Sequence, residues 1–383
     1  MMPVMCRGAL ATACRVLACA LVLVGSSTMA ARAAGAAATA GMSARELVAH
    51  GTAITVRVQT SEACVVAAAG APTGEVDGDG GDASAAAARE SGTAAGDMKD
   101  LLRRLGARRP PPQASASGTL LGTDGDIVSA VLDPGCDRYD VTFADGVRAE
   151  ARLVAIDGEG GIALLRAAPN GRPRGRLAPA GSLQPGDTVV AFGYVHASTL
   201  HVGRGIVGST TRLLPELGGG YRGEFIQSDA DIRRGAAGGP LLDLQGNVVG
   251  VHLAILSTTG AFEGVSYALP ASFVQRALDD LRQHGRVRRG ALGATFQDGV
   301  DDAGRPTVTT TALTPGLPAA AALQVGDRVL AVDGMAVATM DAVAARVQMR
   351  LPGDTVVLRL VRAGVTQEVA LVLGDLADME TEE

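Results

Sequence analysis

The sequence contains very little aromatic side chain: its 383 residues include no tryptophan, four tyrosines and six phenylalanines. Its 47% hydrophobic content is therefore mainly aliphatic, much of it alanine, and still supports buried cores. Lysine is nearly absent as well, because Lys99 is the only one, and the formal net charge is -6. Nucleic acid is excluded as a main partner, since phosphate binding requires a concentrated cationic surface. The length favours two globular units.

Long apolar runs are also missing. The run from Val16 to Gly25 is about 10 residues long, well short of the roughly 20 that span a bilayer, and no later segment reaches that length. Arg7 and Arg15 precede this run and small residues follow it, which predicts a secretory signal peptide over residues 1–33. We expect an exported chain without a transmembrane anchor, in the periplasm of a Gram-negative bacterium. Lipidation at Cys19 is a minor alternative.

Cysteine is scarce in the predicted mature chain. Three of the five cysteines fall in the leader, which leaves Cys64 and Cys136. An oxidising compartment would allow these two to form one disulfide, and two unpaired thiols are the equal alternative.

The chain divides into segments of different composition. Residues 41–116 hold an apolar, strand-like stretch, then a Gly, Ala, Ser and acid-rich insert and a Pro-rich linker. Residues 117–286 alternate short β-branched runs with turns, which is typical of an antiparallel sandwich or barrel, and Asp145-Gly146 predicts a hairpin. A helix capped by Ser272 and ended by Gly285 closes this unit. Residues 287–375 form a second unit, and 376–383 an acidic, solvated tail.

The stretch FIQSDADIRRGAAGGPLLDLQGNVVGVHLAI, residues 225–255, resembles the active-site loop and flanking strands of HtrA-family serine proteases, in which the nucleophile loop reads GNSGGPLL. The resemblance implies a mainly β fold, with a trypsin-like pair of six-stranded barrels, and it places Ala237 where the family has its serine. Such loops need glycine because tight turns aim backbone N–H groups at one point, the oxyanion hole. Gly235, Ala236 and Gly238 are expected to retain this hole.

The other two catalytic positions differ from the family as well. The family's general-base histidine ends a strand that here reads GDIVSAVLD, which puts Leu132 in its place. The orienting aspartate precedes an IALL strand, and here Gly161 stands before it. Leucine accepts no proton and glycine has no side chain. Because losing the nucleophile and base of such a triad costs about 10⁶-fold in rate, we expect a pseudoprotease and not an enzyme.

A second resemblance covers the C-terminal unit. The stretch AALQVGDRVLAVDGMAV is similar to the core of PDZ domains, and RRGALGATF stands where HtrA proteins have their peptide-carboxylate loop. PDZ domains add a ligand's C-terminal segment to a sheet edge, while backbone N–H groups hold its carboxylate. The resemblance implies that the peptide-binding residues are Leu292, Gly293, Ala294, Arg289, Met340, Val343 and Val347. The helical spacing of the last three fits a helix core equally well, with Thr339 as the N-cap.

Histidines provide no further site. His196 and His201 lie in HASTLH, but zinc needs three or four ligands and no Cys/His cluster follows, so we expect a solvated loop. His252 lies in an apolar strand and is expected to be a hydrogen-bonded barrel residue. No cofactor and no metal are predicted.

These expectations lead to one function and two alternatives. The leading hypothesis is a non-catalytic envelope protein whose PDZ domain binds unfolded proteins or peptide C-termini, as a chaperone, adaptor or regulator in protein quality control. The first alternative is a serine endopeptidase of the HtrA family that uses non-standard catalytic residues. The second is an inert subunit that regulates an active paralogue. A homo-oligomer and a hetero-oligomer both remain open.

Overall fold

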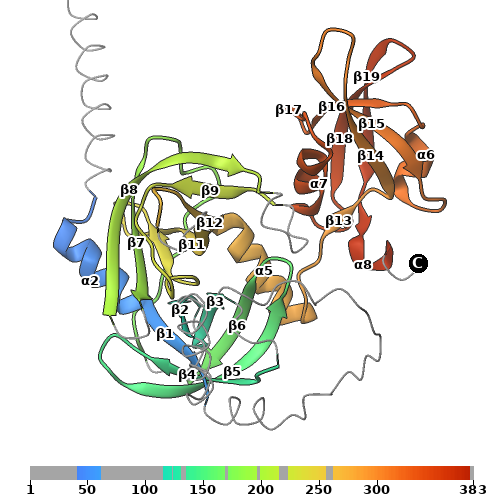
Figure 1. Ribbon diagram of the computed structural model, residues 1–383. Helices are drawn as coiled ribbons and strands as arrows, with labels where there is room; N and C mark the ends of the chain where they lie inside the picture. The colour runs from blue at the N-terminus through green and yellow to red at the C-terminus, as the bar shows by residue number, and fades with distance from the viewer. Residues whose placement is uncertain are drawn as a thin grey trace, which may run out of the picture.

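The computed structural model describes residues 41–61, 115–122, 124–130, 135–168, 171–195, 199–214, 223–255 and 262–379. The predicted leader and the whole of the low-complexity insert lie outside these residues. No helix within the described ranges is both long and apolar enough to cross a bilayer. The described chain is mainly β and contains the two six-stranded closed barrels that the resemblance implies, followed by a smaller sheet domain (Figure 1).

The first barrel closes in the order β1-β2-β3-β6-β5-β4. Its strands are β1 (Thr55–Thr60), β2 (Ser115–Leu120), β3 (Asp126–Ala130), β4 (Arg138–Thr142), β5 (Arg148–Asp157) and β6 (Ile162–Ala167). β1 comes from the segment 41–116, which the sequence set apart, yet it pairs with both β2 and β4 and so completes the barrel. The predicted hairpin is confirmed between β4 and β5, where the Gly146 N–H donates to the Phe143 carbonyl over 2.9 Å.

The second barrel closes in the order β10-β11-β12-β9-β8-β7. Its strands are β7 (Thr188–Val195), β8 (Thr199–Arg212), β9 (Phe225–Ser228), β10 (Pro240–Leu242), β11 (Val248–Ile255) and β12 (Ser266–Pro270). The sequence analysis missed helix α2 (Ala44–Ile54), which Ser43 and Glu46 begin with a capping box. α2 packs closely against β7, because Gly51 leaves room for the ring of Phe192, which a Cβ would approach to 2.2 Å.

Helix α5 (Ala271–His284) follows the second barrel and carries Phe273 and Leu281 into the main hydrophobic core. Gly285 ends it with φ 70°, as predicted. The predicted Ser272 cap is wrong: the helix begins two residues earlier than such a cap implies, and Pro270, which has no side chain that accepts a hydrogen bond, occupies the N-cap position.

The C-terminal domain is built on a sheet in the order β14-β15-β16-β18-β19, with β17 paired to β16. These strands are β14 (Ala294–Val300), β15 (Pro306–Leu313), β16 (Arg328–Val332), β17 (Met335–Ala336), β18 (Thr355–Arg362) and β19 (Val365–Val372). A separate pair joins β13 (Gly290–Ala291) to β20 (Gly374–Asp375), and the helices are α6 (Pro318–Ala322), α7 (Met340–Gln348) and α8 (Leu376–Met379). The Thr339 cap of α7 is confirmed.

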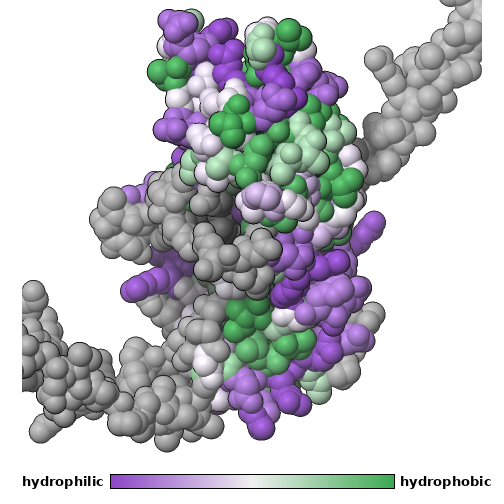
Figure 2. Space-filling view, turned by 90° about the vertical axis from the view of Figure 1, so that its right-hand side faces the viewer, coloured by the Kyte–Doolittle hydropathy of each residue, from purple (hydrophilic) through white to green (hydrophobic). Residues whose placement is uncertain are grey.

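The apolar side chains gather in a core of their own in this domain and in two cores in the barrels. On the face that Figure 2 presents, hydrophobic residues occur in small groups between hydrophilic ones. The C-terminal domain is therefore a folding unit with its own core, attached to the barrels through α5 and β13.

Candidate functional site

The glycine-rich loop before β10 is held in place by the first barrel. The Ser117 Oγ donates to the Gly235 carbonyl over 2.7 Å, and the Ser117 N–H donates to the Ala237 carbonyl over 2.9 Å. The Thr119 Oγ1 donates to the Gly238 carbonyl over 2.8 Å. Three carbonyls of one loop thus accept hydrogen bonds from β2, so the contact between the barrels sets the loop's conformation.

Two glycines of this loop have a backbone conformation that other residues rarely adopt. Gly235 has φ 98° and Gly238 has φ 89°. A Cβ at Gly238 would also lie 2.1 Å from the Ser117 carbonyl oxygen. Glycine is required here by the turn and by the close approach of β2.

The N–H groups of the loop divide into bonded and free ones. The Ala236 N–H donates to the Arg233 carbonyl over 2.9 Å, and the Gly238 N–H donates to the His252 carbonyl over 2.7 Å. Within the described residues, the N–H groups of Gly235 and Ala237 donate no hydrogen bond. The sequence-based set of Gly235, Ala236 and Gly238 therefore needs correction, because only Gly235 keeps a free donor, and the second free donor belongs to Ala237.

Gly161 lies in the turn between β5 and β6, with φ 68°. A Cβ at this position would lie 2.9 Å from the Cδ1 atom of Leu253. Leu253 directly follows His252, whose backbone pairs with Gly238 and Gly239. Gly161 and the glycine-rich loop thus approach neighbouring residues of β11, while Leu132 lies outside the described residues.

Arg289 does not face a peptide groove, contrary to the sequence-based expectation. Its side chain is 7% exposed and reaches the first barrel, where it lies 2.8 Å from the Asp157 carboxylate and 3.0 Å from that of Glu159. Asp157 is itself buried. Since a buried charge needs a partner, this cation serves to join the C-terminal domain to the end of β5.

A second contact joins the same two parts of the chain. Arg346 of α7 lies 3.3 Å from the Glu224 carboxylate, which precedes β9. Burial raises the pKa of Glu224, and the positive charge of Arg346 opposes that rise. The guanidinium of Arg276, on α5, also donates to the Met349 carbonyl over 2.5 Å.

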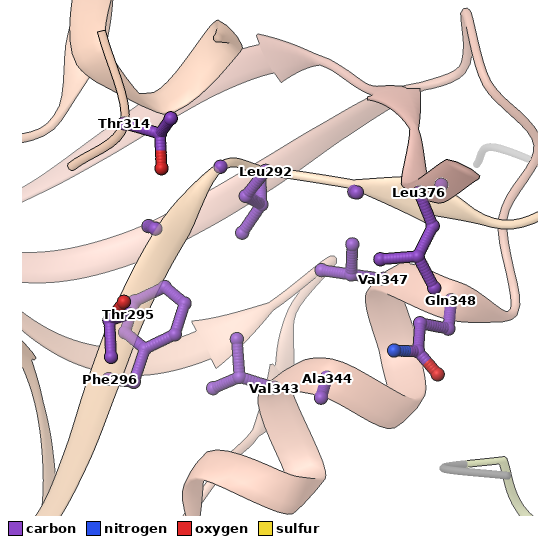
Figure 3. Close-up of a pocket in the computed structure, with 13 residues that line it drawn as sticks. Leu292, Thr295, Phe296, Thr314, Val343, Ala344, Val347, Gln348 and Leu376 are labelled. Carbon is purple, nitrogen blue, oxygen red and sulfur yellow. The ribbon is translucent and has the colours of Figure 1, made fainter. Parts of the chain in front are cut away.

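A groove of about 230 Å³ lies between β14 and α7. Figure 3 shows the side chains of Leu292, Phe296, Val343, Val347 and Leu376 around one apolar space. Gly290, Ala291, Gly293, Ala294, Thr295, Thr314, Ala344 and Gln348 complete its lining. None of these residues is charged, so the groove suits an uncharged side chain.

One end of this groove has free backbone donors. In the described part of the chain, the N–H groups of Leu292 and Gly293 donate no hydrogen bond. Gly293 has φ 74°, and a Cβ there would lie 2.3 Å from the Cβ of Leu317. β14 stands at the edge of its sheet, with a partner strand on one side only. The groove therefore combines N–H donors for an anion with an open strand edge.

Comparison with known proteins agrees with this architecture. Residues 116–251 match the trypsin-like peptidase domain family, and residues 281–361 match the PDZ domain family. A probable periplasmic serine endoprotease DegP-like of Pseudomonas fulva is 31% identical over 282 residues, covering 71% of this chain and 58% of that protein. The similarly named protein of Halomonas elongata is 32% identical over 275 residues, covering 69% of this chain and 57% of the relative. This chain carries an HtrA/DegP-type trypsin-like protease domain and a PDZ domain.

Solved structures share the fold of both domains. An HtrA-type protease AlgW with tripeptide aligns with a TM-score of 0.63 at 21% identity, over 87% of this chain and 97% of that one. A serine endoprotease from Yersinia pestis aligns with a TM-score of 0.54 at 21% identity, over 88% of this chain and 98% of that one.

In the PDZ domain, most of the residues chosen from the sequence lie together. Leu292, Gly293, Ala294, Val343 and Val347 all line the groove. The two valines also belong to the PDZ core, so the two interpretations of their helical spacing both hold. Arg289 does not line the groove, and neither does Met340, whose side chain is 36% exposed at the start of α7.

Sequence reasoning missed the groove residues Phe296, Ala344 and Leu376. Phe296 carried a signal, because it alternates with Ala294 along a strand. Leu376 carried none, since it falls in the segment taken for a solvated tail; α8 covers Leu376–Met379, and residues 380–383 lie outside the described part.

In the trypsin-like domain, His252 differs from the expectation of a hydrogen-bonded residue. Its side chain is 1% exposed, and neither ring nitrogen has a hydrogen-bond partner among the residues that the structure describes. Burial lowers its pKa from 6.5 to about 3, so the imidazole is neutral. Its backbone nevertheless pairs with the glycine-rich loop, as described above.

The remaining predicted residues have mixed outcomes. Cys136 is disulfide-bonded, while Cys64 lies outside the described residues. His201 lies on β8, 3.1 Å from the Asp231 carboxylate, and not in a solvated loop; His196 is not among the described residues. No cluster of three or more metal-ligating side chains occurs within the described ranges.

Proposed function

We propose that this protein is a non-catalytic, HtrA-like peptide-binding protein of the bacterial periplasm, which holds the C-terminal segments of unfolded or partly folded proteins. The curated relatives are named as periplasmic, which supports the compartment. The observation that carries the binding role is the PDZ groove, where free N–H groups of Leu292 and Gly293 stand beside an uncharged apolar space. A C-terminal carboxylate with an apolar last side chain matches both features.

The absence of catalysis is supported by the glycine-rich loop. Its free N–H groups at Gly235 and Ala237 suit an oxyanion, but position 237 offers only a methyl group. Other nucleophiles are badly situated: the Ser228 side chain is buried, its Oγ 2.9 Å from the Ser266 Oγ, and Cys136 is tied in a disulfide. A serine endopeptidase with non-standard residues therefore finds little support.

Binding is tested with a panel of peptides that have a free C-terminal carboxylate and an apolar last residue. Ala344 lines the groove and is half-buried, so Ala344→Glu puts a negative charge beside the ligand without disturbing the PDZ core. We expect the affinity to fall at least tenfold. The matched control is Ala338→Glu, at an exposed residue just before α7, which should leave affinity unchanged. The binding role is wrong if no peptide binds the wild type or if both variants bind equally well.

Catalysis is tested separately on the same preparation. We expect no turnover of casein and no reaction with a fluorophosphonate probe. Turnover that persists through purification together with probe labelling would establish the endopeptidase alternative. Co-purification with a proteolytically active homologue from the native envelope would instead favour a regulatory subunit.

A further inference from the structure

The chain makes contacts of its own at or beyond both ends of the PDZ groove. At the carboxylate-loop end, Leu376 of α8 lines the groove, and its N–H donates to the Arg289 carbonyl over 2.9 Å. At the other end, the Asp298 Oδ1 on β14 accepts a hydrogen bond from the Met340 N–H on α7, over 2.5 Å. The second contact joins the two elements between which a peptide would lie.

Asp298 belongs to the groove side of β14. Side chains alternate along a strand, so Ala294, Phe296 and Asp298 share one face. The burial pattern shows this alternation as far as Phe296, because Ala294 and Phe296 are half-buried while Thr295 and Gln297 are exposed; Asp298 is exposed, and its contact with α7 places its side chain. The Asp298 side chain therefore reaches across the groove to α7.

The open part of the groove ends before this contact. Its lining on β14 stops at Phe296, two residues before Asp298, and on α7 it begins at Val343, three residues after Met340. The Met340 N–H is one of the unsatisfied donors at the helix start, and the Thr339 hydroxyl already serves that of Ala342. Asp298 thus satisfies a donor that the helix cap leaves free.

The length of the open groove can be counted in ligand residues. An added strand advances about 3.3 Å per residue, in step with the strand that it pairs with. With the carboxylate at Leu292 and Gly293, the stretch from Ala294 to Phe296 faces about three ligand residues. The next residue upstream would meet the Asp298–Met340 hydrogen bond.

We propose that the Asp298–Met340 hydrogen bond acts as a clasp that restricts the groove to the last three residues of a peptide C-terminus. This inference rests on the proposed peptide-binding function. A fourth residue gains main-chain pairing with β14 only by breaking the clasp, so the gain and the loss offset each other. Asp298 is then a length-determining residue, and the protein recognises C-termini by their final tripeptide.

The test uses the full chain and N-acetylated peptides that end in Ala-Ala-Leu with a free carboxylate, alone or extended by one, two or four alanines. The extensions are alanines, so that any change of affinity with peptide length comes from main-chain pairing and not from side-chain contacts. Affinities are measured by calorimetry for the wild type, Asp298→Ala and Asp298→Asn. Asp302→Ala, at an exposed aspartate in the turn after β14, is the matched control.

For the wild type we expect the peptide extended by one alanine to bind within about twofold of the tripeptide, because the main-chain hydrogen bond that it gains is offset by the one Asp298–Met340 hydrogen bond that is lost. Asp298→Ala should bind the extended peptides about five- to tenfold more tightly than the tripeptide. Asp298→Asn keeps an acceptor oxygen and should resemble the wild type, as should Asp302→Ala.

Two results would overturn the inference. One is a wild-type protein that gains as much affinity as Asp298→Ala when the tripeptide is extended by one alanine. The other is a wild-type complex in which the longest ligand breaks the Asp298–Met340 hydrogen bond, as seen by faster hydrogen exchange of the Met340 amide, and yet binds as tightly as it binds Asp298→Ala. If no peptide binds any of the four proteins while all melt normally, the proposed function itself has failed.

Discussion

The loop at residues 235–239 and the loop at residues 292–294 present free backbone N–H groups in two different domains. Both rely on a glycine with positive φ that touches another element: Gly238 approaches β2, and Gly293 approaches Leu317. They differ in what surrounds the donors. The PDZ loop faces an apolar groove that is ready for a side chain, whereas the loop of the trypsin-like domain has Ala237 at its centre.

This difference shows how unequally two kinds of function depend on side chains. Acyl transfer requires particular atoms, an oxygen nucleophile and an imidazole, at fixed distances. Holding a carboxylate requires backbone donors, which every residue type supplies, and apolar walls, which several residue types provide. A chain that drifts in sequence can therefore keep its groove after its catalytic groups are gone.

The largest effect is expected at Arg289, which ties the two regions together. Arg289→Met should lower the free energy of unfolding by about 3–5 kcal/mol, because it leaves the Asp157 carboxylate buried without a partner. Peptide affinity should change less than twofold, since Arg289 does not line the groove. Thermal and denaturant unfolding measure the change in stability, and calorimetry measures the peptide affinity.

The control for this prediction is Arg286→Met, which breaks the ion pair with Asp375. The Arg286 side chain is 47% exposed, so the loss should stay below about 1 kcal/mol. If Arg289→Met instead lowers peptide affinity strongly and stability only slightly, Arg289 is a peptide-binding residue, as the sequence suggested.

A smaller effect is expected from His252, behind the glycine-rich loop. The unfolded chain binds a proton at this residue below about pH 6.5, whereas the folded chain does so only near pH 3. The free energy of unfolding therefore has its full value, as far as His252 is concerned, above pH 6.5. It falls as the pH drops, by about 2 kcal/mol at pH 5. His252→Asn should remove this part of the pH dependence, as measured by urea unfolding at pH 7.5 and pH 5.

His284→Asn provides the comparison for His252, because His284 is exposed at the end of α5. It should leave the slope of stability against pH unchanged. If stability depends on pH equally in the wild type and in His252→Asn, folding does not lower the pKa of His252, and the buried imidazole has a hydrogen-bond partner in solution.

The smallest effect concerns Gly161, which the resemblance placed at the family's aspartate position. Gly161→Ala and Gly171→Ala both place a Cβ at φ near 70°, which costs about 1–2 kcal/mol. Of the two, only a Cβ at position 161 makes a new contact, with Leu253 at 2.9 Å; a Cβ at position 171 would meet none of the described residues beyond its chain neighbours within 4 Å. We expect Gly161→Ala to lose about 1 kcal/mol more in thermal unfolding.

Equal losses in the two glycine variants would show that Leu253 moves aside at no cost. The result also decides how to rebuild a triad. Leu132→His, Gly161→Asp and Ala237→Ser together should stay inactive unless Leu253→Ala gives the new carboxylate room.

Much of the fold was predictable because its signals are local. The Asp145-Gly146 turn, the Gly285 helix end and the Thr339 cap each depend on residues within one turn of chain. The helix α2 was missed because its apolar face is short, and its packing depends on Gly51 meeting Phe192, far along the sequence.

The candidate sites were predictable where the role of a residue depends on its backbone or on its small or apolar side chain. Motif resemblance located Gly293, Val343 and Val347, which line the groove through backbone groups or apolar side chains. It failed for Arg289 and Met340, and the apolar strand pattern failed to predict the environment of His252. The role of a long or polar side chain depends on which groups it reaches, and these groups lie on other elements.

The sequence by itself was enough to predict two β-barrels and a PDZ domain, because its motifs resemble those of a family in which such motifs accompany this fold. Only the tertiary structure decided which N–H groups of the glycine-rich loop are free, that Arg289 bonds to Asp157 across domains, and that Asp298 spans the groove to Met340. Each of these depends on a distance between segments far apart in the chain, and such distances are fixed when the cores pack.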